Sequence, residues 1–547
     1  MRALIVFPLK NTELLHYQET IYALRQLCPD DEIVTVAPAE GPSLGILEAN
    51  PCIDRVYPLP GRTPLNELPP NEAIAFLADK QIDKAYVAFR GAGSGSNLRM
   101  VRDAWGYPGT VYLWRVRKKP IPLRSPQGML RAFVNGINLS KMAFEDLFRA
   151  AAERFVAKPL RPNNGGPDQE PLRPNNGGLD DFHPRRILCM PMDGLGDLVI
   201  MMPALRALQR RYPSAQVDVV LREAYLPLYR DLMPNVGLLP FELPKTPARG
   251  RPPAGTREVL MLLGTLRRNR YDLAIDFGGL DLYRQLAFWA GIAVRVGAAR
   301  SNGEDRGRRN WSGLLTCPVH YRHSDSHTHD LAFEVLSTVG VDKTADSTRD
   351  LLVTDEGTAR VRGLVDERGV GGRFALVQAF SVIDAKHWRE DGFAEAIDHM
   401  VEKYDLDILL TGSPGDRAGN DRLRGMSRHQ GRVHNVAGDV SLSDFGCLCA
   451  QASMMLTLDT GPMHFAAAVG TPVVALFLPG TLDLFYPYGQ RKRAICPSAD
   501  ELRVAFGEKQ GRYVDVLGTI ATSRVLAGID RALGKSGVEA VHEAAHR

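Results

Sequence analysis

Apolar residues along the central part of the chain alternate between short continuous runs and helical repeats, which is the pattern of strands alternating with helices. The first unit has strands at 185–191 and 216–221 around a helix over 198–213. It continues with a helix around 257–268, a strand at 271–277, a helix around 280–290 and a short strand at 295–297. Such alternation predicts a parallel sheet covered by helices on both faces.

A second series of the same kind follows a helical stretch near 329–339. The expected strands are 374–378, 407–412, 453–459 and 473–477, and the expected helices are 392–404, 418–429, 443–451 and 462–469. Two consecutive Rossmann-like halves favour a ligand-binding cleft between them, because ligands of such sheets bind beyond the carboxyl ends of the strands.

A repeated low-complexity segment marks the clearest domain boundary. LRPNNGG occurs at 160–166 and again at 172–178, so we interpret 157–184 as a linker rich in Pro, Asn and Gly. The chain then divides into an N-terminal domain at 1–156, a first Rossmann-like half at 185–365 and a second at 366–547.

The N-terminal domain resembles a copy of the first Rossmann-like half. RALIVFPLK (2–10) matches RRILCMPMD (185–193) in character, and ALRQL (23–27) matches ALRAL (204–208). We interpret this as an internal duplication. The loop after the first strand is KNTELL (10–15) in one copy and DGLGD (193–197) in the other. The N-terminal copy has therefore lost the glycines and the aspartate, and its expected role is structural or related to an acceptor.

Composition and cysteine usage narrow the class of protein. The 547 residues are 44% apolar and 24% charged, which is globular. Seven cysteines without CxxC pairs indicate a reducing compartment, so we expect a cytoplasmic protein. The first ten residues have the pattern of a strand and not of a signal peptide. The longest apolar stretch, 465–478, is too short for a membrane-spanning helix.

Basic residues gather in three places although the net charge is only +4. The clusters are RVRKK (115–119), RRNR (267–270) and RGRR (306–309). They suit an anionic acceptor or peripheral contact with the inner membrane, and solvated loop charge explains each of them equally well. Nucleic acid is not expected as a partner, because no recognised binding motif accompanies the clusters.

The turn after the first strand of the 185–365 half contains a candidate site. Gly194 and Gly196 lie between strand and helix, and Asp197 falls at the start of the helix. Asp197 is equally well interpreted as an ordinary helix N-cap.

The motif LDTGPMH in the second half is more specific. A strand ends at Asp459, Thr460 and Gly461 turn the chain, and Pro462 is expected as the first helical residue, with His464 in the first turn. The N–H groups of such a helix start can hold a diphosphate, and a carboxylate can accept hydrogen bonds from sugar hydroxyls. The alternative is a plain strand–turn–helix cap.

Two further loops of the second half lie at the same edge of the expected sheet. Lys386 is a candidate to neutralise a leaving diphosphate, and the turn TGSPGD (411–416) contains Gly412. A solvated loop lysine is the alternative.

Four histidines at 320, 323, 327 and 329 raise the question of a metal site. Their spacing fits no standard ligand pattern, so no metal is expected.

Taken together, these motifs resemble glycosyltransferase family 9, the ADP-heptose:lipopolysaccharide heptosyltransferases. The resemblance rests on DGLGDLVIMMPALRALQRRYP, RYDLAIDFGGL, AKHW, and LDTGPMHFAAAVGTPVVALFLPG followed by YPYG, which occur in this order between about 185 and about 530. It implies an α/β fold of GT-B type, with two Rossmann-like parallel-sheet domains facing a cleft plus the additional N-terminal α/β domain.

The resemblance also implies a chemistry. The 185–365 half would bind a glycan or lipid-linked glycan acceptor, and the 366–547 half a nucleotide-diphosphate sugar as donor substrate, with no cofactor and with inversion at the anomeric carbon. Asp197 would be the general base and Lys386 would bind phosphate. The donor-site motif would comprise Asp459, Thr460, Gly461 and His464.

Three other functions compete with heptose transfer to a lipopolysaccharide core. One is transfer of a different nucleotide-linked sugar, which motifs shared across a family do not separate. Another is a catalytically silent nucleotide-sugar-binding or scaffold protein, which the decayed N-terminal loop suggests and the persistence of Asp197, Lys386 and Asp459 opposes. A nucleotide-dependent oxidoreductase ranks last, because GLGD is not GxGxxG.

Overall fold

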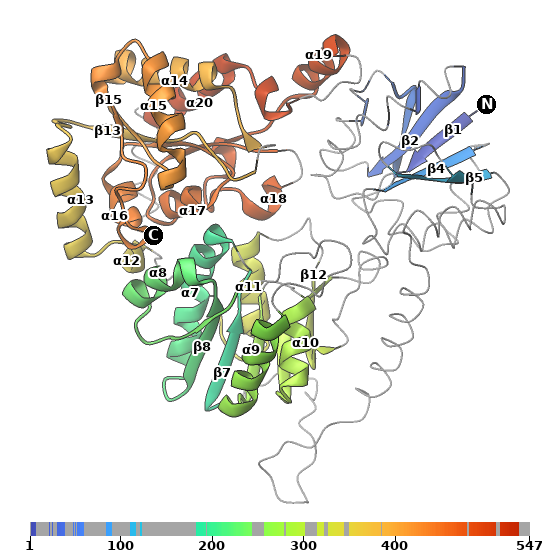
Figure 1. Cartoon of the computed structure of the whole chain (residues 1–547), viewed down its shortest axis with the longest axis vertical. Helices are drawn as coiled ribbons and strands as arrows, with labels where there is room; N and C mark the ends of the chain where they lie inside the picture. Colours follow the sequence, from blue (N-terminus) through green and yellow to red (C-terminus); the bar gives the residue numbers. More distant parts are fainter. Residues whose placement is uncertain are drawn as a thin grey trace, which may run out of the picture.

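Three six-stranded sheets organise the chain in the computed structural model (Figure 1). The residues that the structure describes are 2–6, 21, 24–25, 30–38, 47–48, 50, 52–59, 84–89, 110–115, 121–122, 182–192, 194–242, 256–277, 281–300, 314–321, 327–343, 349–383, 386–478, 481–509 and 515–534. The loop at 10–15, the repeats at 160–166 and 172–178, most of the 115–119 cluster and all of the 306–309 cluster lie outside them.

The first Rossmann-like half is a parallel sheet in the order β12-β11-β10-β7-β8-β9. Its strands are β7 Arg186–Met190, β8 Gln216–Leu221, β9 Gly237–Pro240, β10 Leu273–Asp276, β11 Val294–Arg300 and β12 Cys317–Tyr321. The helices of this part of the chain are α7 Leu195–Arg211, α8 Leu226–Leu232, α9 Thr256–Asn269, α10 Asp281–Trp289 and α11 Thr328–Ser337. Helix α7 begins three residues earlier than expected, so Asp197 is its third residue and not its cap.

The second half repeats the design in the order β15-β14-β13-β16-β17-β18. Its strands are β13 Phe374–Gln378, β14 Asp407–Leu410, β15 Val433–Asn435, β16 Met455–Leu458, β17 Val473–Leu476 and β18 Ala494–Ile495. Its helices are α14 Glu390–Tyr404, α15 Arg417–Met426, α16 Leu442–Gln451, α17 Gly461–Ala468, α18 Leu482–Phe485, α19 Ala499–Lys509 and α20 Thr522–Leu533. Two more helices, α12 Arg349–Leu352 and α13 Asp355–Glu367, precede β13 and pack against α16.

The N-terminal sheet has the same strand order as the other two, β3-β2-β1-β4-β5-β6. Its strands are β1 Arg2–Val6, β2 Glu32–Pro38, β3 Arg55–Leu59, β4 Lys84–Phe89, β5 Thr110–Arg115 and β6 Ile121–Pro122. Strands β1 to β5 are parallel and β6 pairs antiparallel with β5. This order is common to Rossmann folds in general, and the internal duplication stays a prediction from the sequence.

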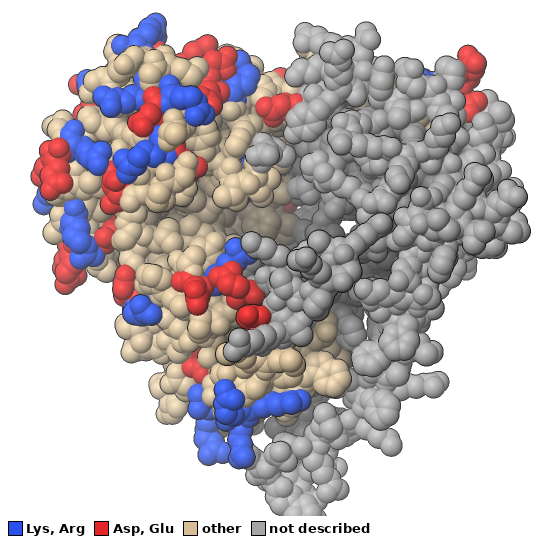
Figure 2. Space-filling model, in the orientation of Figure 1, with Lys and Arg blue, Asp and Glu red and all other residues tan. Residues whose placement is uncertain are grey.

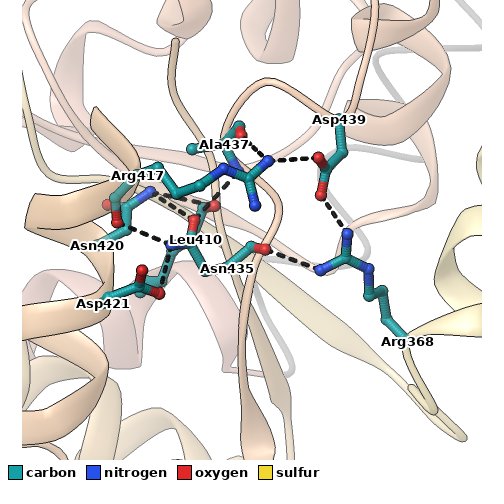
Figure 3. Close-up of polar contacts among 8 residues, drawn as sticks. All are labelled: Arg368, Leu410, Arg417, Asn420, Asp421, Asn435, Ala437 and Asp439. Atoms are coloured by element: carbon teal, nitrogen blue, oxygen red, sulfur yellow. Dashed lines mark hydrogen bonds and ion pairs between the residues drawn. The ribbon is translucent and has the colours of Figure 1, made fainter. Parts of the chain in front are cut away.

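A polar network attaches α13 and α15 to the edge strand β15 (Figure 3). Arg368, directly after α13, donates to the carbonyl of Asn435 at 3.0 Å and pairs with Asp439. Arg417, the first residue of α15, pairs with the same carboxylate at 2.5 Å. Asn435 in turn donates from Nδ2 to Asp421 of α15 at 2.7 Å. The carboxylate of Asp439 thus pairs with one arginine that follows α13 and with one from α15, and this connects both helices to the edge of the sheet.

The two Rossmann-like halves share a continuous buried core. One cluster contains Leu198 and Met202 of α7 together with Met463 and Phe465 of α17. Helix α7 contacts α17, and α8 contacts α16, where Ser443 donates to Asp231 at 2.5 Å. The GT-B arrangement therefore depends on helices of one half packing against helices of the other. Among the described residues, no helix is both long and apolar enough to cross a bilayer.

Candidate functional site

Lys386 and Asp459 meet where the strand order of the second half reverses. Asp459 follows β16 and Lys386 lies in the loop after β13, and these strands are parallel neighbours. Nζ of Lys386 lies 2.7 Å from Oδ2 of Asp459 and donates to its carbonyl at 3.0 Å. The two side chains are only 17% and 6% exposed. Two residues 73 positions apart thus form a nearly buried ion pair at the edge where nucleotides bind in such sheets.

Thr481 completes this pair and had not been singled out in the sequence. It follows β17, and its hydroxyl donates to Oδ2 of Asp459 at 3.0 Å. Both Lys386 and Thr481 therefore contact the same carboxylate oxygen, which fixes its direction. The sequence did offer a signal for Thr481, since it is a polar residue soon after a buried strand. Because β17 is the parallel neighbour of β16, residues that follow the two strands lie at the same edge of the sheet.

The other polar residues of the Lys386 loop point elsewhere. His387 bonds to the carbonyl of Ser381 at 2.8 Å, and Trp388 is buried and donates from Nε1 to the carbonyl of Ile520 at 3.0 Å. Arg389 reaches Thr522 at 2.9 Å. Of the KHWR run, Lys386 is the residue that contacts Asp459, and its neighbours anchor the loop to the C-terminal elements.

Helix α17 begins beside this ion pair. Thr460 is its N-cap residue in extended conformation, Gly461 is its first residue and Pro462 its second, one position later than expected. Its first turn contains His464, whose side chain is buried and whose Nδ1 has no hydrogen-bond partner among the described residues. Burial lowers the pKa of His464 to about 3, with further lowering by His327 and Lys386. The imidazole is therefore neutral, and its buried Nδ1 is an unsatisfied polar atom among the described residues.

Glycines let the start of α7 contact the start of α17. A Cβ added to Gly196 would overlap Cδ2 of His464 and lie 3.3 Å from Cα of Gly461. A Cβ added to Gly461 would lie 2.9 Å from Cβ of Leu195. The DGLGD turn and the LDTGPMH turn, which belong to different halves, therefore meet through backbone atoms.

Asp197 lies in the first turn of α7, on the same turn as this contact. Its side chain is partly buried and folds toward the preceding residues, since a Cβ at Gly194 would lie 2.6 Å from its Oδ2. The structure thus brings Gly194, Gly196 and Asp197 to the junction between the halves. Asp459 precedes Gly461 by two residues, so the Lys386–Asp459 pair lies next to this junction in the second half.

Gly412 lies two residues after β14 and has a different environment. Its φ of +151° favours glycine, and a Cβ there would lie 2.7 Å from Oδ2 of Asp416. Its carbonyl accepts from Gly438 at 2.9 Å. These contacts connect Gly412 to its own turn and to the loop that follows β15.

Histidines from the HYRHSDSHTHD segment connect the two halves. Nε2 of His327 donates to the carbonyl of Tyr486 at 2.9 Å, and its Nδ1 caps α11 by accepting from the backbone of His329 at 3.0 Å. The hydroxyl of Thr328 donates to the carbonyl of Leu484 at 3.1 Å. The start of α11 is therefore bonded to the segment around α18. We call this contact the α11 clasp.

Aromatic stacking and one carboxylate extend the α11 clasp. The ring of His329 stacks on Tyr488 with centroids 4.0 Å apart. Asp330 accepts from Lys343 and Tyr488, each at 2.7 Å. Burial lowers the pKa of His327 to about 4, so this imidazole is neutral as well. Burial raises the pKa of Asp330, but hydrogen bonds from Lys343, Tyr488 and His329 lower it to about 2.

The described histidines of this segment have other partners. His327 and His329 serve as cap and stacking partners, whereas His323 and the side chain of His320 lie outside the described residues. Within the part of the chain that the structure describes, no group of three or more His, Cys, Asp or Glu side chains is arranged to hold a metal ion.

The chain is similar to known glycosyltransferases. Residues 259–508 match the model of glycosyltransferase family 9 (heptosyltransferase). The chain is similar to lipopolysaccharide heptosyltransferase 3 of Escherichia coli strain K12, with 27% identity over 291 residues, 52% of this chain and 79% of that protein. It is also similar to lipopolysaccharide heptosyltransferase 2 of the same strain, with 29% identity over 363 residues, 64% of this chain and 98% of that protein.

A solved structure supports the fold. The crystal structure of the glycosyl transferase family 9 from Veillonella parvula DSM 2008 superposes with a TM-score of 0.51 at 18% identity, covering 64% of this chain and 97% of that one. At this identity, the likeness concerns the arrangement of sheets and helices alone.

Proposed function

Because the chain is a glycosyltransferase of family 9, we propose that it moves heptose from ADP-heptose to a lipopolysaccharide-core or related glycan acceptor, with inversion and without a metal ion. The observation that carries this proposal is the contact of the DGLGD turn with the LDTGPMH turn, beside the Lys386–Asp459 pair. It joins a carboxylate from one half to a cation and a helix start from the other.

Asp197 is the proposed general base. Its carboxylate accepts the proton of the acceptor hydroxyl as the hydroxyl oxygen bonds to the anomeric carbon. The bond from that carbon to the diphosphate oxygen breaks on the opposite face, and the electron pair leaves with ADP. Attack opposite to the leaving group inverts the anomeric centre.

Lys386 and the start of α17 are the proposed partners of the diphosphate. The ammonium group and the positive end of the α17 helix dipole stabilise the negative charge that grows on the leaving group. Because Lys386 pairs with Asp459 in this structure, the donor must share or replace that contact. We propose that Asp459 then binds a sugar hydroxyl, and that neutral His464 and the Thr460 and Pro462 turn shape the same site. Gly412 is proposed to border the donor from β14.

The proposed setting is the cytoplasm, next to the inner membrane. The six cysteines of the described part of the chain are all free thiols, which suits a reducing compartment. A lipid-linked acceptor would bring the enzyme to the membrane surface.

The test offers ADP-heptose and a panel of UDP- and GDP-sugars to the wild type, to Asp197→Ala and to Asp366→Ala, with and without chelator. Asp366 is an exposed residue of α13 and serves as the matched control. We expect one donor to be used regardless of chelator, a loss of about 10²–10⁴-fold in kcat for Asp197→Ala, and no change for the control. The anomeric configuration of the product, measured by NMR, tests inversion.

Other results identify the alternatives. Turnover of a UDP- or GDP-sugar alone would make the protein a transferase of a different sugar. If the wild type binds a donor but transfers nothing to any glycan acceptor, the silent-binder hypothesis holds. Activity that survives in Asp197→Ala would remove Asp197 as the base.

A further inference from the structure

Helix α9 presents apolar and basic side chains to solvent on one face. Leu260 and Met261 are 61% and 60% exposed, the highest values among the large apolar residues of the first half that the structure describes. Arg267 and Arg268 follow seven residues later on the same helix. Seven residues are close to two turns, so each arginine lies in line with one apolar residue about 10 Å away.

The neighbouring helix extends this surface. Trp289, the last residue of α10, is 49% exposed. Arg267 donates from Nε and Nη2 to the carbonyl of Trp289 at 3.1 and 3.0 Å, which holds the two helix ends together. Arg270, exposed in left-handed conformation, follows α9. We call the surface formed by Leu260, Met261, Arg267, Arg268, Arg270 and Trp289 the α9 face.

The arginines of the α9 face differ from several arginines of the second half. Arg422, Arg428 and Arg432 each pair with a carboxylate there. Among the described residues, by contrast, Arg267, Arg268 and Arg270 form no ion pair. Figure 2 shows Lys and Arg side chains gathered at the lower end of the first half, where Figure 1 draws α9 and β7. The charge of the α9 face is therefore uncompensated within that part of the chain.

We propose that the α9 face docks on an anionic phospholipid bilayer. Leu260, Met261 and Trp289 would enter the boundary between headgroups and acyl chains, and the arginines would lie against lipid phosphates. Apolar side chains in line with arginines that form no ion pair match the two layers of a bilayer surface, acyl chains and phosphates. A helix that only faces water would instead have polar residues or paired charges at the exposed positions of the α9 face. The proposal rests on the proposed function in that a lipid-linked acceptor needs the enzyme at the bilayer.

The test measures co-sedimentation of the full chain with vesicles, without donor or acceptor, so its failure is distinct from failure of the transferase proposal. The vesicles are phosphatidylcholine alone or phosphatidylcholine mixed with phosphatidylglycerol. The variants are Leu260→Ser with Met261→Ser, and Arg267→Gln with Arg268→Gln. The matched control is Arg503→Gln with Val504→Ser on α19, where Val504 is 59% exposed beside Arg503. Thermal melting verifies that each variant folds.

We expect the wild type to bind the anionic vesicles and not the zwitterionic ones, and to release them at high salt. Each basic residue near an anionic surface contributes about fivefold in affinity, so loss of both arginines should weaken binding by about 25-fold. The apolar pair should weaken it by at least about tenfold, and the control should bind like the wild type.

Equal binding by wild type and both α9 variants would overturn the proposal. Gel filtration provides a second check. A wild-type dimer that Leu260→Ser with Met261→Ser converts to a monomer would mean that a second copy of the chain covers the α9 face, which also overturns it.

Discussion

The pairing of Lys386 with Asp459 is the feature of single residues on which the proposed chemistry most depends. The sequence had suggested separate partners for them, phosphate for Lys386 and a sugar hydroxyl for Asp459. The structure joins them at 2.7 Å, with Thr481 on the same carboxylate oxygen. A buried ion pair of this kind holds the lysine in a fixed position. Removing one member leaves the other charge buried and unpaired, which destabilises the fold.

Lys386→Met should therefore affect both activity and stability. We expect kcat to fall by about 10²–10³-fold, because a leaving diphosphate loses its cation, and the free energy of unfolding to fall by about 3 kcal/mol, because Asp459 remains buried and unpaired. The measurements are transfer kinetics and denaturant unfolding. In Lys386→Met with Asp459→Asn, stability should recover while activity does not. Recovery of activity in the double variant would exclude a catalytic role for Lys386.

Gly196 is a second position where a single added atom, a Cβ, should change the stability of the fold. Alanine ordinarily favours a helix over glycine, but a Cβ at Gly196 would overlap His464. We expect Gly196→Ala to lower the free energy of unfolding by about 1–3 kcal/mol. Gly363→Ala in α13, where no atom lies within 4 Å of the added Cβ, should raise it by about 0.5–1 kcal/mol. A stabilised Gly196→Ala protein would show that the two turns are not in contact in solution.

At the level of elements, strands with continuous apolar runs were predicted best. The strands at 374–378 and 216–221 were predicted with the bounds observed for β13 and β8, since every residue of β13 and all but the first of β8 are buried. Strands β15 and β18 were missed because they contain three and two residues, with His434 and Asn435 in β15. Helix α13 was missed because its apolar residues are few, and its place depends on contacts with α16.

The α11 clasp should make the stability of the folded protein depend on pH. Nδ1 of His327 accepts a hydrogen bond and its Nε2 donates one, so protonation would place a second donor against the backbone N–H of His329. The pKa of His327 is about 4 in the folded protein and 6.5 when unperturbed. The unfolded chain therefore binds the proton first, and stability falls as the pH decreases from 6.5 to 4, by up to about 1.4 kcal/mol per pH unit for this group.

The measurement is denaturant unfolding at pH 7, 6 and 5 for wild type and His327→Asn. Asparagine keeps an acceptor at the helix cap but does not titrate. The variant should lose less stability than the wild type between pH 7 and pH 5, because His464, whose pKa is also lowered, still contributes. Identical slopes in the two proteins would mean that His327 is not buried as a neutral imidazole.

At the scale of the whole molecule, the three sheets share one strand order, and the buried core that joins the two Rossmann-like halves contains, among the described residues, none from the N-terminal sheet. The main buried clusters of the two Rossmann-like halves contain residues from Ile187 onward. The N-terminal sheet has the strand order of the other two, whereas the sequence after its first strand contains no DGLGD motif.

A chain restricted to residues 182–547 should therefore fold and bind ADP. We expect one cooperative unfolding transition. The affinity for ADP should stay within about threefold of that of the full chain, a difference of under about 1 kcal/mol in binding free energy. Calorimetry and isothermal titration measure the two quantities. A truncated chain that folds but no longer binds ADP would show that residues 1–156 contribute to the donor site.

The sequence alone determined the alternation of strands and helices and the identity of the residues at the ends of strands. It also predicted a division of the chain into three parts. It could do so because periodicity and loop chemistry are local properties. Only the tertiary structure decided that Gly196 touches His464, that Lys386 pairs with Asp459 and that His327 holds Tyr486. These contacts join residues 73 to 268 positions apart. The pairing of strands β13 and β16 within one sheet brings Lys386 to Asp459, and packing between the two halves makes the other two contacts, so none of them follows from local pattern.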